Sequence, residues 1–248
     1  MTEEKYYFKD FTRRNYRELL KLAKSKFRFK GYDEIKNKEN QSILWRHDVD
    51  FSMHSALALA KIEYEEGVTS TFFLMAHCEF YNLLEKEISQ IVLKIRDFGH
   101  DVGIHFDSHY YEIEDESDIE KHLKKEFSLF ESMFQISPTA FSFHNTTPFT
   151  MSCEKEEYYG LTNAYSSFFK TELDYCSDSN GYWRYNRLLD FLNTPRSKNV
   201  QVLTHPAWWQ DDVMSPFDRI KRSVKGRHDK VLNDYTAALE KGGVKNVL

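Results

Sequence analysis

The sequence predicts an α/β fold in which βαβ units build a parallel sheet or barrel. Short apolar stretches typical of strands alternate with longer stretches whose apolar residues recur at helical spacing, and this unit repeats along the first half of the chain. The 248 residues include only 9 glycines and 5 prolines, which predicts long elements and few tight turns. The length suits one α/β barrel, and no repeat or linker divides the chain, so we expect a single domain over residues 1–248.

The first elements follow in order from the N-terminus. Apolar residues spaced as on one helical face predict a helix from Asp10 to about Phe29. A strand is expected from Ser42 to His47. Ser52 can then cap a helix from Met53 to Glu66, which ends at Gly67.

The rest of the chain continues the alternation, except in one irregular region. Between Thr146 and Ser197 aromatic residues are dense and periodicity is poor, so no element is predicted with clear bounds there. The other predicted elements are, in order, strand Thr69 to Met75, helix Leu83 to Phe98, strand Asp101 to His105, helix Ile119 to Phe134, strand Thr139 to Phe143, strand Val200 to Thr204 and a mostly helical stretch from Pro216 to Lys241.

Composition excludes several classes of function. The chain has 34 basic and 39 acidic residues, a net charge of −5, so no nucleic-acid partner is expected. Cys78, Cys153 and Cys176 are widely spaced, which indicates neither a disulfide framework nor a cysteine zinc site. The N-terminal Met1-Thr-Glu-Glu-Lys lacks the apolar segment of a secretory signal, and no stretch of about 20 apolar residues predicts a membrane span. We therefore expect a cytoplasmic location.

Candidate catalytic residues follow three predicted strands, at the edge where α/β folds collect their active sites. The first group is Arg46-His47-Asp48-Val49-Asp50. Because side chains alternate along a strand, Asp48 and Asp50 can project to the same side, with Arg46 below them. Two carboxylates on one rim suit a metal ligand and a general base. An aspartate pair that only caps the following helix is the alternative.

The other two strand ends carry histidines. His105 and His109 are four residues apart, so one helical turn after the strand would place both imidazoles on a single face. With a carboxylate from elsewhere they would form a two-histidine, one-carboxylate metal site, whereas two surface histidines in a loop are the alternative. His205 ends a strand and precedes a proline, which suits a general acid or base. Trp208 could form an apolar wall for a sugar ring, although tryptophans more often belong to the core.

Taken together, the D-x-D pair, the H-x-x-x-H pair and the late strand ending in histidine resemble the polysaccharide deacetylases of the NodB-homology type, carbohydrate esterase family 4. The resemblance covers about Ile43 to Trp209. More narrowly, Arg46-His47-Asp48-Val49-Asp50 with Thr204-His205-Pro206-Ala207-Trp208-Trp209 resembles the divergent branch found among bacterial surface-polysaccharide biosynthesis genes. The resemblance implies a distorted, TIM-like β/α barrel of about seven parallel strands, preceded here by a helical extension over residues 1–40. It also implies a divalent metal, usually zinc, and hydrolysis of N-acetyl groups on sugars.

The resemblance further implies roles for individual residues, and the chain departs from the family pattern at one of them. The family's third motif supplies an arginine that orients the base, but the corresponding strand here ends Ser142-Phe143-His144-Asn145. We hypothesise that Arg46 or His144 takes over that role, and that Trp183 could add an aromatic platform for substrate, with core packing as its alternative. The roles carried over by motif are the catalytic base for Asp48, metal ligands for Asp50, His105 and His109, and the general acid for His205.

Three other functions stay open. A haloacid-dehalogenase-like phosphatase would use Asp48 as nucleophile, but Phe51 and Ser52 follow the pair where glycine and threonine are usual. A D-x-D glycosyltransferase would carry its motif deeper in the chain. A pseudoenzyme that binds metal and sugar without turnover would account for the departure at the third motif. The expected substrate is an N-acetylated small sugar or glycan precursor, such as a nucleotide-linked or lipid-linked sugar.

Overall fold

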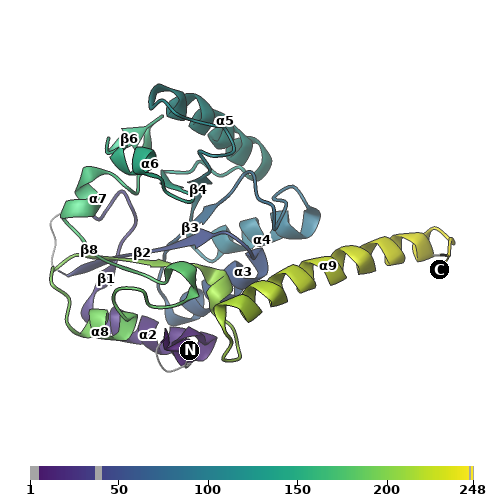
Figure 1. Ribbon diagram of the computed structural model, residues 1–248, viewed down its shortest axis with the longest axis horizontal. Helices are drawn as coiled ribbons and strands as arrows, with labels where there is room; N and C mark the ends of the chain where they lie inside the picture. The colour runs from purple at the N-terminus through teal and green to yellow at the C-terminus, as the bar shows by residue number, and fades with distance from the viewer. Residues whose placement is uncertain (1–5, 37–40, 246, 248) are drawn as a thin grey trace.

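A curled, mostly parallel sheet forms the centre of the computed structural model, which describes residues 6–36, 41–245 and 247 (Figure 1). The N-terminal Met1 to Lys5 segment considered above lies outside these residues. The strands are β1 Arg28–Phe29, β2 Ser42–Val49, β3 Thr71–Leu74, β4 Asp101–Phe106, β5 Ala140–Phe143, β6 Glu157–Tyr158, β7 Leu161–Asn163, β8 Asp174–Ser177 and β9 Val200–Thr204.

The predicted α/β class is confirmed by the strand order, β6-β7-β5-β4-β3-β2-β9-β8, with β1 beside β2. Every pairing is parallel except β6 with β7. The seven strands from β7 to β8 therefore point the same way, and their carboxyl ends share one edge. Within the described part of the chain the two ends of this order do not pair, so the sheet is a half-barrel and not a closed barrel.

The helices match the predictions best where the sequence carries clear caps. Ser52 Oγ accepts from the Ser55 amide, and Gly67 ends the same helix with a φ of 65°, a left-handed conformation that suits glycine. No helix in the described ranges is both long and apolar enough to cross a bilayer. The helices are η1 Phe8–Phe11, α2 Arg13–Lys26, α3 Met53–Glu66, α4 Lys86–Asp97, α5 Ser117–Phe134, α6 Pro148–Ser152, α7 Ser167–Thr171, η2 Ser179–Gly181, α8 Leu188–Asn193, η3 Pro206–Trp208 and α9 Pro216–Lys241.

Buried apolar side chains cover both faces of the sheet. One cluster packs α3, α4 and α5 onto β3, β4 and β5, a second packs α2 and α8 onto β2 and β9, and a third fills the concave interior. Gly103 belongs to this interior wall, and a Cβ there would lie 2.4 Å from the Phe73 ring. The missing side chain therefore makes room for that ring. The long helix α9 leaves this body and extends outward from it (Figure 1).

A buried polar network lies between the sheet and helices α2 and α3. The Glu63 carboxylate, fully buried, accepts hydrogen bonds from the Tyr16 hydroxyl, from Nε2 of His47 at 2.7 Å and from Oγ of Ser70 at 2.5 Å. Nδ1 of His47 in turn lies 2.8 Å from Oγ1 of Thr204. Because its members come from α2, β2, α3 and β9 and from the turn before β3, this network joins the helical layer to the strands that carry the site.

Candidate active site and metal centre

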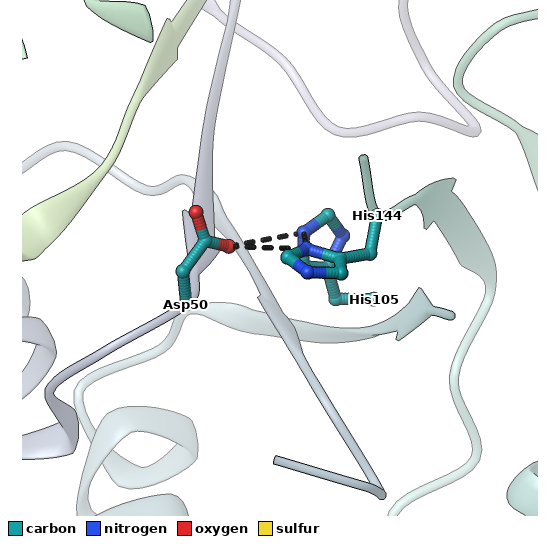
Figure 2. A group of neighbouring side chains, drawn as sticks. All are labelled: Asp50, His105 and His144. Atoms are coloured by element: carbon teal, nitrogen blue, oxygen red, sulfur yellow. Dashed lines mark hydrogen bonds and ion pairs between the residues drawn. The ribbon is translucent and has the colours of Figure 1, made fainter. Parts of the chain in front are cut away.

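The polar residues predicted at strand ends gather at the carboxyl edge of the half-barrel. Asp50 follows β2, His105 lies in β4 and His144 follows β5. Although β3 separates β2 from β4, the curl of the sheet turns their side chains toward the concave side. Ligand atoms of these three residues lie within 4.8 Å of one another (Figure 2).

Distances within this group are short and nearly equal. Oδ1 of Asp50 lies 3.1 Å from Nε2 of His105 and 3.7 Å from Nδ1 of His144, and those two nitrogens are 3.2 Å apart. Burial by itself raises the pKa of Asp50, but the two imidazoles and the charge of His205 outweigh it and hold this pKa well below its usual value. Burial lowers the pKa of His144, but the Asp50 carboxylate reverses the shift and raises it. Asp50 is therefore a carboxylate anion at neutral pH.

The structure brings His144, and not His109, to Asp50 and His105. His105 lies within β4 itself, so the helical spacing expected for His105 and His109 does not apply. His109 is exposed in the following turn, and its Nε2 donates to the Asn145 carbonyl at 2.9 Å. His144 reaches the group because β4 and β5 are in parallel register, with His105 opposite Ser142. His144 directly follows the strand predicted to end at Phe143, and this strand-end position is the sequence signal that could have found it.

Asp48 lies beneath the group, on the same side of β2 as Asp50. It is 2% exposed, its Oδ1 accepts from Oγ of Ser142 at 3.3 Å, and its Oδ2 lies 3.6 Å from Nη2 of Arg46. Ser142 also hydrogen-bonds Nδ1 of His105 at 2.7 Å, so one hydroxyl touches both the carboxylate and a candidate ligand. Arg46 thus occupies the place beside Asp48 that the alternation along β2 predicts, whereas His144 lies in the candidate metal group.

His205 also lies near Asp50, and it has a hydrogen-bond partner that the sequence did not predict. Its Nδ1 donates to Oδ1 of Asp178 at 2.6 Å, and its Nε2 lies 3.8 Å from Oδ2 of Asp50. Asp178 is fully buried and also accepts from the His205 amide and from Nε1 of Trp209. Burial lowers the pKa of His205, but the Asp178 carboxylate reverses this and raises it to about 9. Asp178 follows β8, so the strand-end rule would have indicated it had β8 been predicted.

A cleft of about 810 Å³ opens onto this edge of the sheet. Asp50 and His144 line it, together with residues that follow β3 and β4. Neither tryptophan proposed for substrate lines it. Trp183 donates its Nε1–H to Asp10 at 2.9 Å and stacks on a phenylalanine of the core, and Trp208 is 6% exposed and packs in the same cluster. Both side chains therefore pack in the core under α2 and α8. Core packing was the alternative to substrate contact considered for them.

The residues present fit a divalent metal ion. Oδ1 of Asp50 is buried, and no group in the described residues satisfies hydrogen-bond geometry with it. Ligand atoms about 2 Å from a tetrahedral ion lie roughly 3.3 Å from one another, and the three separations here are 3.1, 3.2 and 3.7 Å. Two imidazoles and one carboxylate also leave coordination positions for water and substrate.

No family model matches the chain, and no curated protein matches it. Among solved structures it is similar to a family 4 acetyl xylan esterase from Clostridium thermocellum in complex with a cobalt ion, with 12% identity over 75% of this chain and 84% of that chain and a TM-score of 0.44. It is also similar to the chitin deacetylase from Colletotrichum lindemuthianum, with 13% identity, coverage of 77% and 84%, and a TM-score of 0.42. A CE4 family pseudoenzyme from Bacillus anthracis matches with 13% identity, coverage of 78% and 63%, and a TM-score of 0.47.

Proposed function

We propose that the protein is a metal-dependent hydrolase that removes N-acetyl groups from a sugar or glycan precursor used in surface-polysaccharide biosynthesis. One observation carries the proposal: a mostly buried carboxylate and two imidazoles lie at ligand spacing, with Asp48 on one flank and His205 on the other. The proposed ligands are Asp50, His105 and His144, and the proposed ion is zinc, which readily takes nitrogen and oxygen ligands in tetrahedral sites.

Asp48 is the proposed general base. When bound, a divalent ion at this site polarises the acetyl carbonyl and lowers the pKa of water from 15.7 to about 7. Asp48 then accepts the proton of the attacking water, since it is a carboxylate within 4.0 Å of the ligand His105 and is held by Ser142.

Arg46 is the proposed positioning residue for this base. Its guanidinium is 1% exposed and faces Oδ2 of Asp48 at 3.6 Å, while Nη2 also donates to the Tyr165 hydroxyl at 3.2 Å. Substituting Arg46→Ala should lower kcat and move the pH profile of the reaction, because the Asp48 carboxylate loses its cation. An Arg46→Ala enzyme with unchanged turnover and pH profile would exclude this role.

His205 is the proposed general acid. Collapse of a tetrahedral adduct expels an amine, which must be protonated to leave, and an imidazolium is a suitable donor near neutral pH. Asp178 accepts from Nδ1 and so keeps Nε2, the atom that faces Asp50, as the donating nitrogen. Asp178 thus orients the proposed acid without touching substrate.

The decisive experiment measures acetate release. Purified protein is dialysed against a chelator, reloaded with zinc and incubated with N-acetylglucosamine oligomers and with UDP-N-acetylglucosamine. We expect acetate from the reloaded protein, little from the chelated protein, and one metal ion per chain by elemental analysis. A protein that binds one zinc ion and releases no acetate would indicate the binding-only alternative, and a protein that binds no metal would refute the proposal.

A further inference from the structure

One wall of the cleft is a pair of stacked rings outside the proposed catalytic group. His77 lies in the loop that follows β3, and Tyr110 lies in the turn that follows β4. Their ring centroids are 3.7 Å apart with an interplanar angle of 8°, and both residues line the cleft that also contains Asp50 and His144. Tyr110 is 57% exposed, so one face of its ring is free to meet a ligand.

A chain of polar contacts behind this wall orients His77. Its Nε2 lies 2.9 Å from the Tyr111 hydroxyl, and that hydroxyl faces the Glu126 carboxyl, which is 3% exposed. The Tyr111 ring is itself held by stacking on Phe106, with centroids 5.6 Å apart. Neither Tyr111 nor Glu126 has a part in the proposed hydrolysis, so these polar contacts are left without a role in catalysis.

The ionisation of these groups determines where the hydrogens lie. Burial raises the pKa of Glu126 to about 8, so this carboxyl is a poorer acceptor for the Tyr111 hydrogen than an ionised carboxylate would be. Burial also lowers the pKa of His77, which keeps the imidazole neutral. Tyr111 then donates its own hydrogen to Nε2 of His77, and the single imidazole proton resides on Nδ1. No protein group in the described residues hydrogen-bonds this Nδ1.

We propose that His77 is a substrate-binding residue whose Nδ1–H donates to an oxygen of the bound sugar, while the exposed ring of Tyr110 packs against the apolar face of the same sugar. Tyr111 and Glu126 are positioning residues that hold the donor in place. The class of ligand, an N-acetylated sugar, is taken from the proposed function, on which this inference rests. A cleft that combines an aromatic wall with one fixed polar donor is the usual form of a specific small-molecule site.

The test compares single variants on chitotetraose, a chain of four N-acetylglucosamine units. His77→Phe keeps a ring for stacking and removes the donor, so we expect KM to rise about 3- to 10-fold, as for one lost hydrogen bond. The turnover number and the zinc content should stay within about twofold of wild type. His77→Gln restores a side-chain donor and should recover part of the affinity. His228→Phe, at an exposed position of α9, is the matched control and should leave both constants unchanged.

Tyr111→Phe separates positioning from simple packing. It keeps the ring and its stacking and removes the hydroxyl, so KM should rise in the same direction as for His77→Phe. The buried Glu126 carboxyl loses a polar neighbour, so the melting temperature should fall by a few degrees at most. A fall in turnover number or zinc content without a change in KM, in either variant, would overturn the inference. So would a KM equal to that of the control.

Failure of the proposed function can be told apart from failure of this inference. If wild-type protein releases no acetate, binding of chitotetraose is measured directly by isothermal titration calorimetry, without added metal. Weaker binding by His77→Phe than by His228→Phe would then support the sugar site although the hydrolase proposal has failed. Equal binding by the two variants, or no binding by wild-type protein, would overturn it.

Discussion

Replacing Glu63 by glutamine should destabilise the protein strongly, although the side chain lies outside the catalytic group. The carboxylate is fully buried and accepts from Tyr16, His47 and Ser70, which come from α2, β2 and the turn before β3. Glutamine has nearly the same shape but no charge and only one accepting oxygen. The substitution Glu63→Gln therefore leaves buried donors without a suitable acceptor.

The expected magnitude follows from the burial of the pair formed by Glu63 and His47, both of whose side chains are 0% exposed. Removing one partner of such a pair usually costs about 3–5 kcal/mol of unfolding free energy. For a chain of this size each kcal/mol lowers the melting temperature by about 2–4 °C, so a fall of roughly 6–20 °C is expected. The matched control is Glu65→Gln on the same helix, whose side chain is 40% exposed and pairs with Arg17. Because that ion pair is exposed to solvent, the change should leave the melting temperature nearly unchanged.

The effect of Glu63→Gln should depend on pH in a defined direction. Burial raises the pKa of Glu63, but the charge and hydrogen bond of His47 outweigh it and hold the pKa below its usual value of 4.5. A carboxyl whose pKa is lower in the folded state than in the unfolded state stabilises the protein fully at pH values above the unfolded pKa. This stabilisation is lost as the pH falls from the unfolded pKa toward the folded pKa. The difference between wild type and Glu63→Gln should therefore be full at pH 7 and shrink below about pH 4.5.

Thermal unfolding followed by circular dichroism measures both effects, with urea titration as a second measure of the free energy. The wild type, Glu63→Gln and Glu65→Gln are compared at pH 7 and at pH 4. The reasoning is refuted if the two variants melt within about 2 °C of each other at pH 7. It is also refuted if the deficit of Glu63→Gln grows on acidification.

Four further predictions concern the site, the sheet and helix α9. His144→Ala should lose stoichiometric zinc after dialysis, whereas His109→Ala should keep it, and the reverse result in elemental analysis would restore the ligand set expected from the motif. His205→Ala should keep zinc and lose acetate release by about 10²- to 10⁴-fold, and turnover equal to wild type would remove it as general acid. Gly103→Ala, where a Cβ meets a buried aromatic ring at 2.4 Å, should cost about 1–3 kcal/mol or more. Gly226→Ala, with open space around it in α9, should stabilise the helix by up to about 1 kcal/mol, as urea titration can show.

Predictions from the sequence were most accurate for elements with strong local signals. The helix Met53–Glu66 has the predicted bounds because a serine cap and a glycine end are properties of neighbouring residues. The strand Val200–Thr204 and the helix Pro216–Lys241 agree equally well. In the region from Thr146 to Ser197 the elements are only a few residues long, too short for periodicity to emerge, and there β8 and the residue that follows it, Asp178, were missed.

The amino-acid sequence by itself determined the α/β class, the alternation of strands and helices, and the concentration of acidic and histidine residues at strand ends, because local propensity and alternation along a strand depend on near neighbours. Tertiary structure decided which of those residues meet. His144 joins Asp50 and His105, and Asp178 reaches His205, through the pairing and curl of strands distant in the chain. His109, although near His105 in sequence, turns away to a backbone carbonyl. The geometry of such a site depends on strand register and sheet curvature, which residue spacing along one segment does not encode.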